Sequence, residues 1–291
     1  MDNMLKILMI GAHPDDCDFR CGGIAIKYAR KGHSVTFLSV TDGSSGHHEM
    51  KPAELAERRR NEAKKAASTA GIRYDVWDNR DGELLPGLEN RRRLIRYIRE
   101  IKPDLIITHR LGDYHPDHRA TSVLVQDASY MLIVPSICPE AEALKEMPVI
   151  MHCYDGFTNP RFEPDVVVGI DDVIEKKFEM LSCHESQMYE WLPYTYGRLS
   201  EVPEEKAERL AWLHEPRIPE GGMDADEAVI NTVVKGPSSE YREAFPASKY
   251  RKNLIERYGE NGKRIKFAEA FSVSEYGSPL TKEKEKELFP F

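Results

Sequence analysis

Short apolar runs alternate with longer amphipathic segments along most of this chain. The runs of strand length are Leu5–Ile10, Ser34–Val40, Arg73–Trp77, Asp104–Thr108, Val149–Cys153 and Asp165–Ile170. The segments with apolar residues at helical spacing are Gly22–Lys31, Ala53–Ala70, the stretch around Leu94 to Ile101, Arg119 to Tyr130, and Asp171 to about His184. Strands that alternate with helices are typical of βαβ units. We therefore predict an α/β, Rossmann-like fold with a mainly parallel sheet flanked by helices.

The pattern weakens beyond residue 190. Proline, glycine and charged residues dominate from Trp191 to Ala247, which is typical of a long loop or lid. Phe267–Val273 then alternates like a late strand that rejoins the fold. We expect a domain over residues 1–190 that carries the chemistry, and an extension over residues 191–291 packed on the same domain. Substrate specificity is expected to reside in residues 188–247.

Composition narrows the classes of function. The 291 residues are 41% hydrophobic, enough for a sizeable core, and the net charge of −8 argues against nucleic acid as a partner. The apolar run near the N-terminus is too short to span a membrane and lacks a cleavage site. The five cysteines form an odd set without a Cys-x-x-Cys pair, which fits a reducing compartment. We therefore expect a cytoplasmic protein.

Two polar clusters follow predicted strands, and each contains a His-Pro-Asp group. Ala12–Asp16 follows the first strand, and Asp113–His118 follows a later one. Open α/β sheets bind ligands at the carboxyl ends of their strands. A catalytic zinc typically takes three protein ligands from His, Asp or Glu and keeps one position for water. His13, Asp16 and His118 supply such a set, so we predict a divalent-metal site.

The other polar residues of these clusters are candidates for catalysis. Asp15 is adjacent to the ligand Asp16 but should point elsewhere, so we expect it to act as general base. His115 is expected to stabilise an oxyanion or to protonate a leaving amine. Asp117 is expected to hydrogen-bond His115 and raise its basicity. One His-Pro-Asp-Asp turn is often only a helix cap, but two clusters at separate strand ends favour a site.

The two motifs together resemble the PIG-L/LmbE family of metal-dependent N-deacetylases. In that family an Ala-His-Pro-Asp-Asp turn is followed by a later His-Pro-Asp-His turn, and both are intact here. Weaker matches are Thr41-Asp42-Gly43 and His184-Glu185-Ser186-Gln187. The resemblance implies that His13, Asp16 and His118 carry zinc, with Asp15 as the base and His115 as the electrophilic or acid group.

The resemblance also suggests contacts to substrate. One of Arg59 and Arg60 is expected to reach the substrate, although most of a run of three arginines should form a solvated helix face. Tyr114 and His184 are further substrate-binding candidates, and for His184 packing inside the fold is an equal alternative. The chain departs from the family pattern at Cys17, Ser44 and Asp113, where relatives often have Glu, Glu and Tyr.

We therefore expect a zinc-dependent N-deacetylase, a hydrolase of linear amide bonds. Attack of Zn²⁺-bound water would remove the acetyl group from an N-acetylglucosamine-containing conjugate. The expected partner is this small-molecule amino-sugar conjugate, and the sequence leaves open whether the chain forms a homo-oligomer.

Two alternatives to the deacetylase stay open. A mononuclear iron oxygenase also uses two histidines and a carboxylate, but such enzymes favour antiparallel barrels. A non-catalytic sugar-binding domain is the other alternative. The intact ligands and base argue against it.

Overall fold

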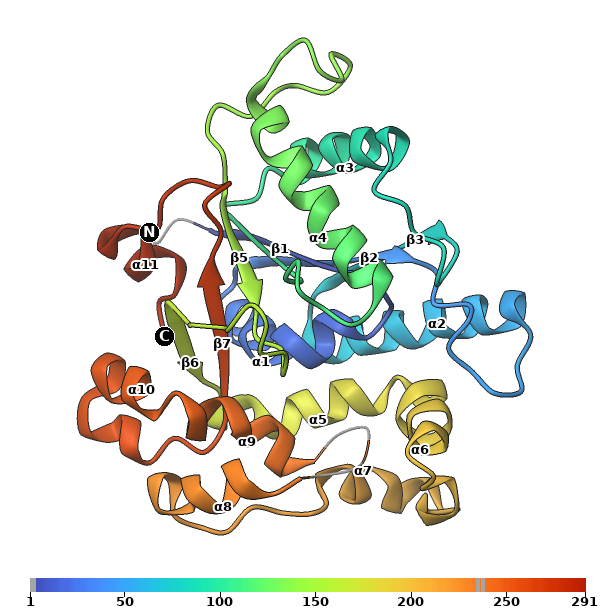
Figure 1. Cartoon of the computed structure of the whole chain (residues 1–291), viewed down its shortest axis with the longest axis vertical. Coiled ribbons are helices and arrows are strands. Elements are labelled where there is room, and N and C mark those ends of the chain that lie inside the picture. The colour runs from blue at the N-terminus through green and yellow to red at the C-terminus, as the bar shows by residue number, and fades with distance from the viewer. Residues whose placement is uncertain (1–3, 234–235, 237–238) are drawn as a thin grey trace.

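A seven-stranded sheet forms the centre of the computed structural model, which describes residues 4–233, 236 and 239–291 (Figure 1). The strands are β1 Lys6–Gly11, β2 Ser34–Thr41, β3 Arg73–Asn79, β4 Leu105–Thr108, β5 Val149–Cys153, β6 Val166–Gly169 and β7 Ala268–Val273. Their order across the sheet is β3-β2-β1-β4-β5-β7-β6. Neighbours from β3 to β5 are parallel, whereas β7 is antiparallel to both β5 and β6. The predicted α/β fold with a mainly parallel sheet is confirmed.

Helices cover both faces of the sheet. They are α1 Asp16–Arg30, α2 Pro52–Ala70, α3 Leu88–Ile101, α4 Pro116–Ser129, α5 Ile174–Ser182, α6 Leu192–Thr195, α7 Lys206–His214, α8 Asp226–Asn231, α9 Glu240–Lys249, α10 Arg251–Tyr258 and α11 Lys282–Leu288. Figure 1 shows α3 and α4 on one face and α1, α2 and α5 on the other. Among the residues that the structure describes, no helix is both long enough and apolar enough to cross a bilayer.

The central strand β1 supplies side chains to both cores. Ile7 and Met9 pack in the core that also holds Phe178 of α5, whereas Leu8 and Ile10 pack in the core beneath α3 and α4. Successive side chains of a strand point to opposite faces, so a strand covered on both sides must be apolar throughout. Burial of each such side chain contributes about 1.5–3 kcal/mol. This packing fixes β1, and with it the turn that follows.

Two helices begin earlier than the sequence pattern predicted. We expected helices from Gly22 and from Arg119, but α1 begins at Asp16 and α4 at Pro116. Proline is favourable in the first turn of a helix because its missing N–H has no partner there. The two polar clusters therefore sit in the turns that open α1 and α4.

The expectation of one long irregular segment from Trp191 to Ala247 is wrong, because it contains α6, α7, α8 and most of α9. These helices are short, which weakens their periodicity in the sequence. Leu213, Val229 and Ala244 from this segment are buried in the same core as Phe178. The late strand β7 lies within the predicted range and inserts between β5 and β6.

Candidate metal centre and catalytic site

The site lies where the strand order of the sheet reverses direction. β1 continues to β2 on one side, while β4 lies on its other side and leads to β5. Ile10 of β1 pairs with Thr108 of β4, so the two strands end together. The crevice outside the carboxyl ends of strands at such a point is the common ligand site of open α/β sheets.

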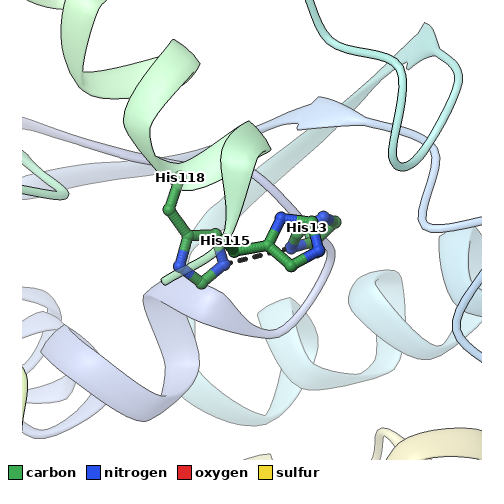
Figure 2. Close-up of side chains that lie close together, drawn as sticks. All are labelled: His13, His115 and His118. Carbon is green, nitrogen blue, oxygen red and sulfur yellow. Dashed lines mark hydrogen bonds between the residues drawn. The ribbon is translucent and has the colours of Figure 1, made fainter. Parts of the chain in front are cut away.

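The three predicted metal ligands converge at this edge. His118 Nε2 lies 3.3 Å from His13 Nδ1 and 3.3 Å from Asp16 Oδ1. His13 Nδ1 lies 3.4 Å from Asp16 Oδ2. Figure 2 shows the rings of His13 and His118 turned toward each other, with His115 beside them. Two imidazoles and one carboxylate around one point form the donor set that suits a catalytic zinc.

Carboxylates orient both ligand histidines. His13 Nε2 lies 3.1 Å from Asp81 Oδ1 and 3.3 Å from Asp117 Oδ2. His118 Nδ1 lies 3.0 Å from Asp113 Oδ1. A carboxylate on one ring nitrogen fixes the tautomer and leaves the other nitrogen free to bind a metal. The inward nitrogens are therefore His13 Nδ1 and His118 Nε2.

Asp117 was expected to hydrogen-bond His115, but its carboxylate has other partners. Its carboxylate contacts His13 and accepts hydrogen bonds from the backbone N–H groups of Gly82 and Leu84, at 2.7 and 3.2 Å. Only the backbone N–H of Asp117 reaches His115, donating to Nδ1 at 3.2 Å. The carboxylate of Asp117 therefore contacts His13, a proposed metal ligand, and it acts on His115 through its charge, which raises the pKa of His115 and offsets part of the lowering by burial.

The charge distribution of the site favours a cation. Burial alone would lower the pKa of His13, but its carboxylate neighbours, Asp117 first, raise it well above its usual range. Burial likewise opposes a charge on His118, yet Asp16 and Asp113 raise its pKa to about 9. In the absence of a metal these imidazoles hold protons as positive charge among carboxylates. A divalent cation can replace those protons, so the residues fit the predicted metal.

Asp15 lies beside the ligand set and is paired with Arg59. Its Oδ2 is 3.0 Å from Arg59 Nη2, and both residues are buried. Burial raises the pKa of Asp15, and the charge of Arg59 offsets this only in part. A carboxylate with a raised pKa is a better proton acceptor, which suits the predicted general base.

Arg59 does not take the predicted role at the substrate, whereas a contact of Arg60 with the substrate stays a prediction. Arg59 is 2% exposed and donates to the carbonyl oxygens of Gly43 and Pro14 in addition to its pairing with Asp15. It therefore holds the turn that carries Asp15. The pKa of the exposed Asp78 is lowered, chiefly by the hydrogen bond from Arg93. The charge of Arg60 makes a smaller contribution in the same direction.

His115 and Tyr114 stand at the opening of the site. The His115 ring is half-buried and meets the His13 ring edge-on at a centroid distance of 4.6 Å. Burial, followed by the charges of His13 and His118, lowers the pKa of His115. Because its Nδ1 accepts a hydrogen bond from Asp117, the neutral ring carries its proton on Nε2. The Tyr114 ring is 67% exposed and contacts the His115 and His118 rings.

The structure places His184 inside the fold rather than at the substrate. It is 0% exposed, and its Nε2 lies 3.0 Å from Asp18 Oδ1 of α1. The expectation of a substrate contact is therefore wrong, and the alternative of packing holds.

Two polar residues of the site escaped the sequence analysis. His109 follows β4 directly, and its Nε2 lies 3.2 Å from Asp16 Oδ2. Burial, then the charge of His118, lowers the pKa of His109 to about 4, so it is neutral at neutral pH. Asp81 follows β3 and contacts His13. Both lack a motif, but both sit just past a strand that ends at the ligand edge, and that signal could have found them.

Comparison with known proteins agrees with this fold, a mainly parallel sheet covered by helices. The family model described as PIG-L, GlcNAc-PI de-N-acetylase, matches residues 8–129. Diacetylchitobiose deacetylase of Thermococcus kodakarensis is 31% identical over 68% of this chain and 80% of that protein. The chain belongs to the PIG-L family, and the resemblance inferred from its motifs is confirmed.

Two further relatives show the range of this similarity. 4-Oxalmesaconate hydratase of Pseudomonas putida is 26% identical over 65% of this chain and 76% of that protein. The solved structure of N,N'-diacetylchitobiose deacetylase from Pyrococcus horikoshii has a TM-score of 0.64 at 21% identity, and covers 94% of this chain and 85% of that chain. This likeness shows a shared fold, which also differs from the antiparallel barrels of the iron oxygenase alternative.

Proposed function

We propose that this protein is a metal-dependent deacetylase that removes the acetyl group from an N-acetylglucosamine-containing conjugate. The observation that carries the proposal is the convergence of His13, Asp16 and His118, with the carboxylate of Asp15 beside them. Similarity to diacetylchitobiose deacetylase supports the reaction and the class of substrate. The finer assignments, Zn²⁺ as the metal and each residue's role, belong to this proposal.

His13, Asp16 and His118 would hold the metal, which lowers the pKa of a water molecule and polarises a carbonyl when it is bound. Asp15 accepts a proton from the attacking water, whose oxygen bonds to the acetyl carbon. The neutral His115 donates a hydrogen bond from its Nε2–H to the carbonyl oxygen as negative charge develops there. Asp15 then gives the proton that it accepted to the leaving nitrogen as the carbon–nitrogen bond breaks, which releases a free amine and acetic acid, and the acid ionises to acetate.

Arg59 and Tyr114 have supporting roles in this proposal. Arg59 orients Asp15 through its guanidinium and keeps the turn at Gly43 and Pro14 in place. The exposed ring of Tyr114, together with Phe157 at a centroid distance of 5.7 Å, forms an apolar wall at the opening. Such a wall suits contact with the face of a sugar ring.

The test is a screen of zinc-loaded protein against N-acetylglucosamine conjugates, beginning with diacetylchitobiose, that detects free amine and acetate. Asp15→Asn should reduce turnover by about 10²–10⁴-fold while metal content stays stoichiometric. Asp172→Asn, a change to an exposed carboxylate paired with Lys27, serves as the matched control and should leave turnover unchanged. Near-normal deacetylation by Asp15→Asn would show that this assignment is wrong.

A second candidate is addition of water to a double bond, because one relative is a hydratase. The site favours the amide reaction. Its carboxylates include Asp15, Asp16 and Asp81. In the part of the chain that the structure describes, the arginine that contacts them is Arg59, which is buried. An unsaturated organic acid would meet repulsion there that a neutral amide avoids. Loss of ultraviolet absorbance from 4-oxalmesaconate, without acetate release from any amide, would favour the hydratase.

A further inference from the structure

His109 is buried against two of the residues that would hold the metal. It directly follows the last residue of β4 and is 4% exposed. Its ring is parallel to that of His118, with a centroid distance of 4.1 Å and an interplanar angle of 7°. Its Nε2 lies 3.2 Å from Asp16 Oδ2. His109 thus contacts one ligand through its ring face and another through its ring nitrogen.

The two oxygens of Asp16 have different surroundings. Oδ2 accepts hydrogen bonds from the backbone N–H groups of Ala12 and His13, at 2.9 and 2.7 Å, and also faces His109. Oδ1 faces His118 Nε2 at 3.3 Å. Oδ2 also lies 3.4 Å from His13 Nδ1, so each oxygen faces one ligand nitrogen, and Oδ2 differs by accepting the backbone hydrogen bonds of Ala12 and His13.

The hydrogen bonds around His109 indicate which of its ring nitrogens carries the proton. Ala12 N–H lies 2.9 Å from Asp16 Oδ2 and 3.1 Å from His109 Nε2. If the proton of the neutral ring is on Nε2, His109 donates to Asp16, and Ala12 N–H bonds to the same carboxylate oxygen. The other tautomer would place two electron-rich atoms 3.2 Å apart with no proton between them. The backbone of His109 is itself held, because His152 Nδ1 lies 2.7 Å from its carbonyl oxygen.

We propose that His109 is a positioning residue that restricts Asp16 to one oxygen, Oδ1, toward the metal. It does so by donating to Oδ2 and by stacking on His118. This inference rests on the proposed metal site. A carboxylate that binds through one oxygen keeps the coordination number low, which leaves positions for water and for the substrate oxygen. His109 would thus keep the centre open for catalysis without binding the metal itself.

Two substitutions separate the contacts of His109. His109→Phe keeps the ring on His118 but removes the donor, and His109→Gln keeps an N–H donor near the position of Nε2 but removes the ring. Each variant is loaded with Co²⁺, and its visible absorption spectrum and its metal affinity by chelator competition are compared with those of the wild-type protein. Four-coordinate Co²⁺ absorbs more strongly than five- or six-coordinate Co²⁺.

His109→Phe should weaken metal affinity by about 10–100-fold, because Asp16 loses one of the donors that orient it. It should also lower the Co²⁺ absorption, because Oδ2 is then less restrained from binding the metal as a second oxygen. His109→Gln should retain most of the wild-type absorption. Spectra and affinity that are unchanged in His109→Phe would overturn the role of His109 while leaving the metal site intact. A wild-type protein that binds no divalent cation would overturn the proposed function and this inference together.

Discussion

Two clusters of buried charges in this protein differ in whether their own groups satisfy each other. In the first, Lys177 is 1% exposed and its Nζ donates to Glu243 Oε2, Glu269 Oε1 and the Phe19 carbonyl oxygen at 2.7, 2.8 and 2.9 Å. Glu269 also accepts hydrogen bonds from the backbone N–H groups of Gly23 and Ile24. This cluster joins α5, α9, β7 and α1, and its polar groups are occupied.

The metal centre is the opposite case. None of its three proposed ligands is a permanent cation, and the inward nitrogens of His13 and His118 lie 3.3 Å apart with Asp16 beside them. Such an arrangement is unfavourable unless protons or a metal separate these groups. The difference teaches that burial of charge alone does not mark a functional site. Buried nitrogen and oxygen atoms that face one another and need a proton or a metal between them do.

Breaking the cluster around Lys177 should have the largest effect on stability. Lys177→Met leaves the carboxylates of Glu243 and Glu269 buried without their cation, which should lower the free energy of unfolding by about 3–5 kcal/mol. Urea unfolding measures this change. Lys176→Met, next in the chain but paired with Glu179 at the surface, is the matched control and should cost less than about 1 kcal/mol. Equal losses in the two variants would contradict the comparison.

Removing the metal from the proposed metal centre should have the second largest effect on stability. A ligand at 100 times its Kd stabilises the native state by about 2.7 kcal/mol, so a chelator should lower the melting temperature of metal-loaded protein. His118→Ala lacks a ligand and should show little response to the same chelator. Calorimetry with and without chelator checks both. A shift of equal size in His118→Ala would argue against the proposed ligand set.

A smaller effect should follow from disturbing the support of His13. Asp117→Asn keeps the shape of the side chain but removes the charge beside His13 Nε2, so metal affinity should fall by about 10–100-fold. Chelator competition measures the affinity. Asp127→Asn on the exposed side of α4, where Asp127 pairs with Arg91, is the control. If Asp117→Asn bound metal as tightly as the control, this carboxylate would not orient His13.

The smallest effect concerns the buried pair of His184 and Asp18. Burial alone would lower the pKa of His184, but Asp18 raises it above its usual value. Because the native state then binds more protons than the unfolded state, stability from this pair is complete below pH 6.5 and is lost as pH rises through the native pKa. The slope is at most about 1.4 kcal/mol per pH unit. His184→Gln should remove this dependence of the unfolding free energy on pH, as measured by urea unfolding at several pH values. A dependence identical to that of the wild type would refute the prediction.

The sequence predicted most of the fold and the ligand set because both depend on local pattern. Buried parallel strands are apolar throughout, so β1, β2 and β5 were placed within one residue at each end. His13 and Asp16 belong to a single turn, and His118 belongs to a second motif of the same kind. Knowing that strand ends meet at one edge was then enough to bring these residues together.

Roles that depend on side-chain direction were harder to predict. A run of three arginines does not show which one points inward, although Leu55, Arg59 and Ala63 lie four residues apart on the buried stripe of α2. His109 stands alone after a strand, so no motif marked it. The short helices between α5 and β7 form through contacts with the core, and such contacts leave little periodicity in the sequence.

The position of β7 has a consequence for synthesis of the chain. Among the strands of the described residues, β6 pairs with β7 alone, whereas β1 to β5 pair among themselves before β7 is added. At about 5–20 residues per second, the ribosome needs roughly 5–20 seconds to proceed from Gly169 to Ala268. During that time β5 and β6 expose unpaired backbone that can join strands of other chains. The arrival of β7 covers the free edge of β5 and one edge of β6, so a nascent chain stalled in this interval should be the form most prone to aggregate.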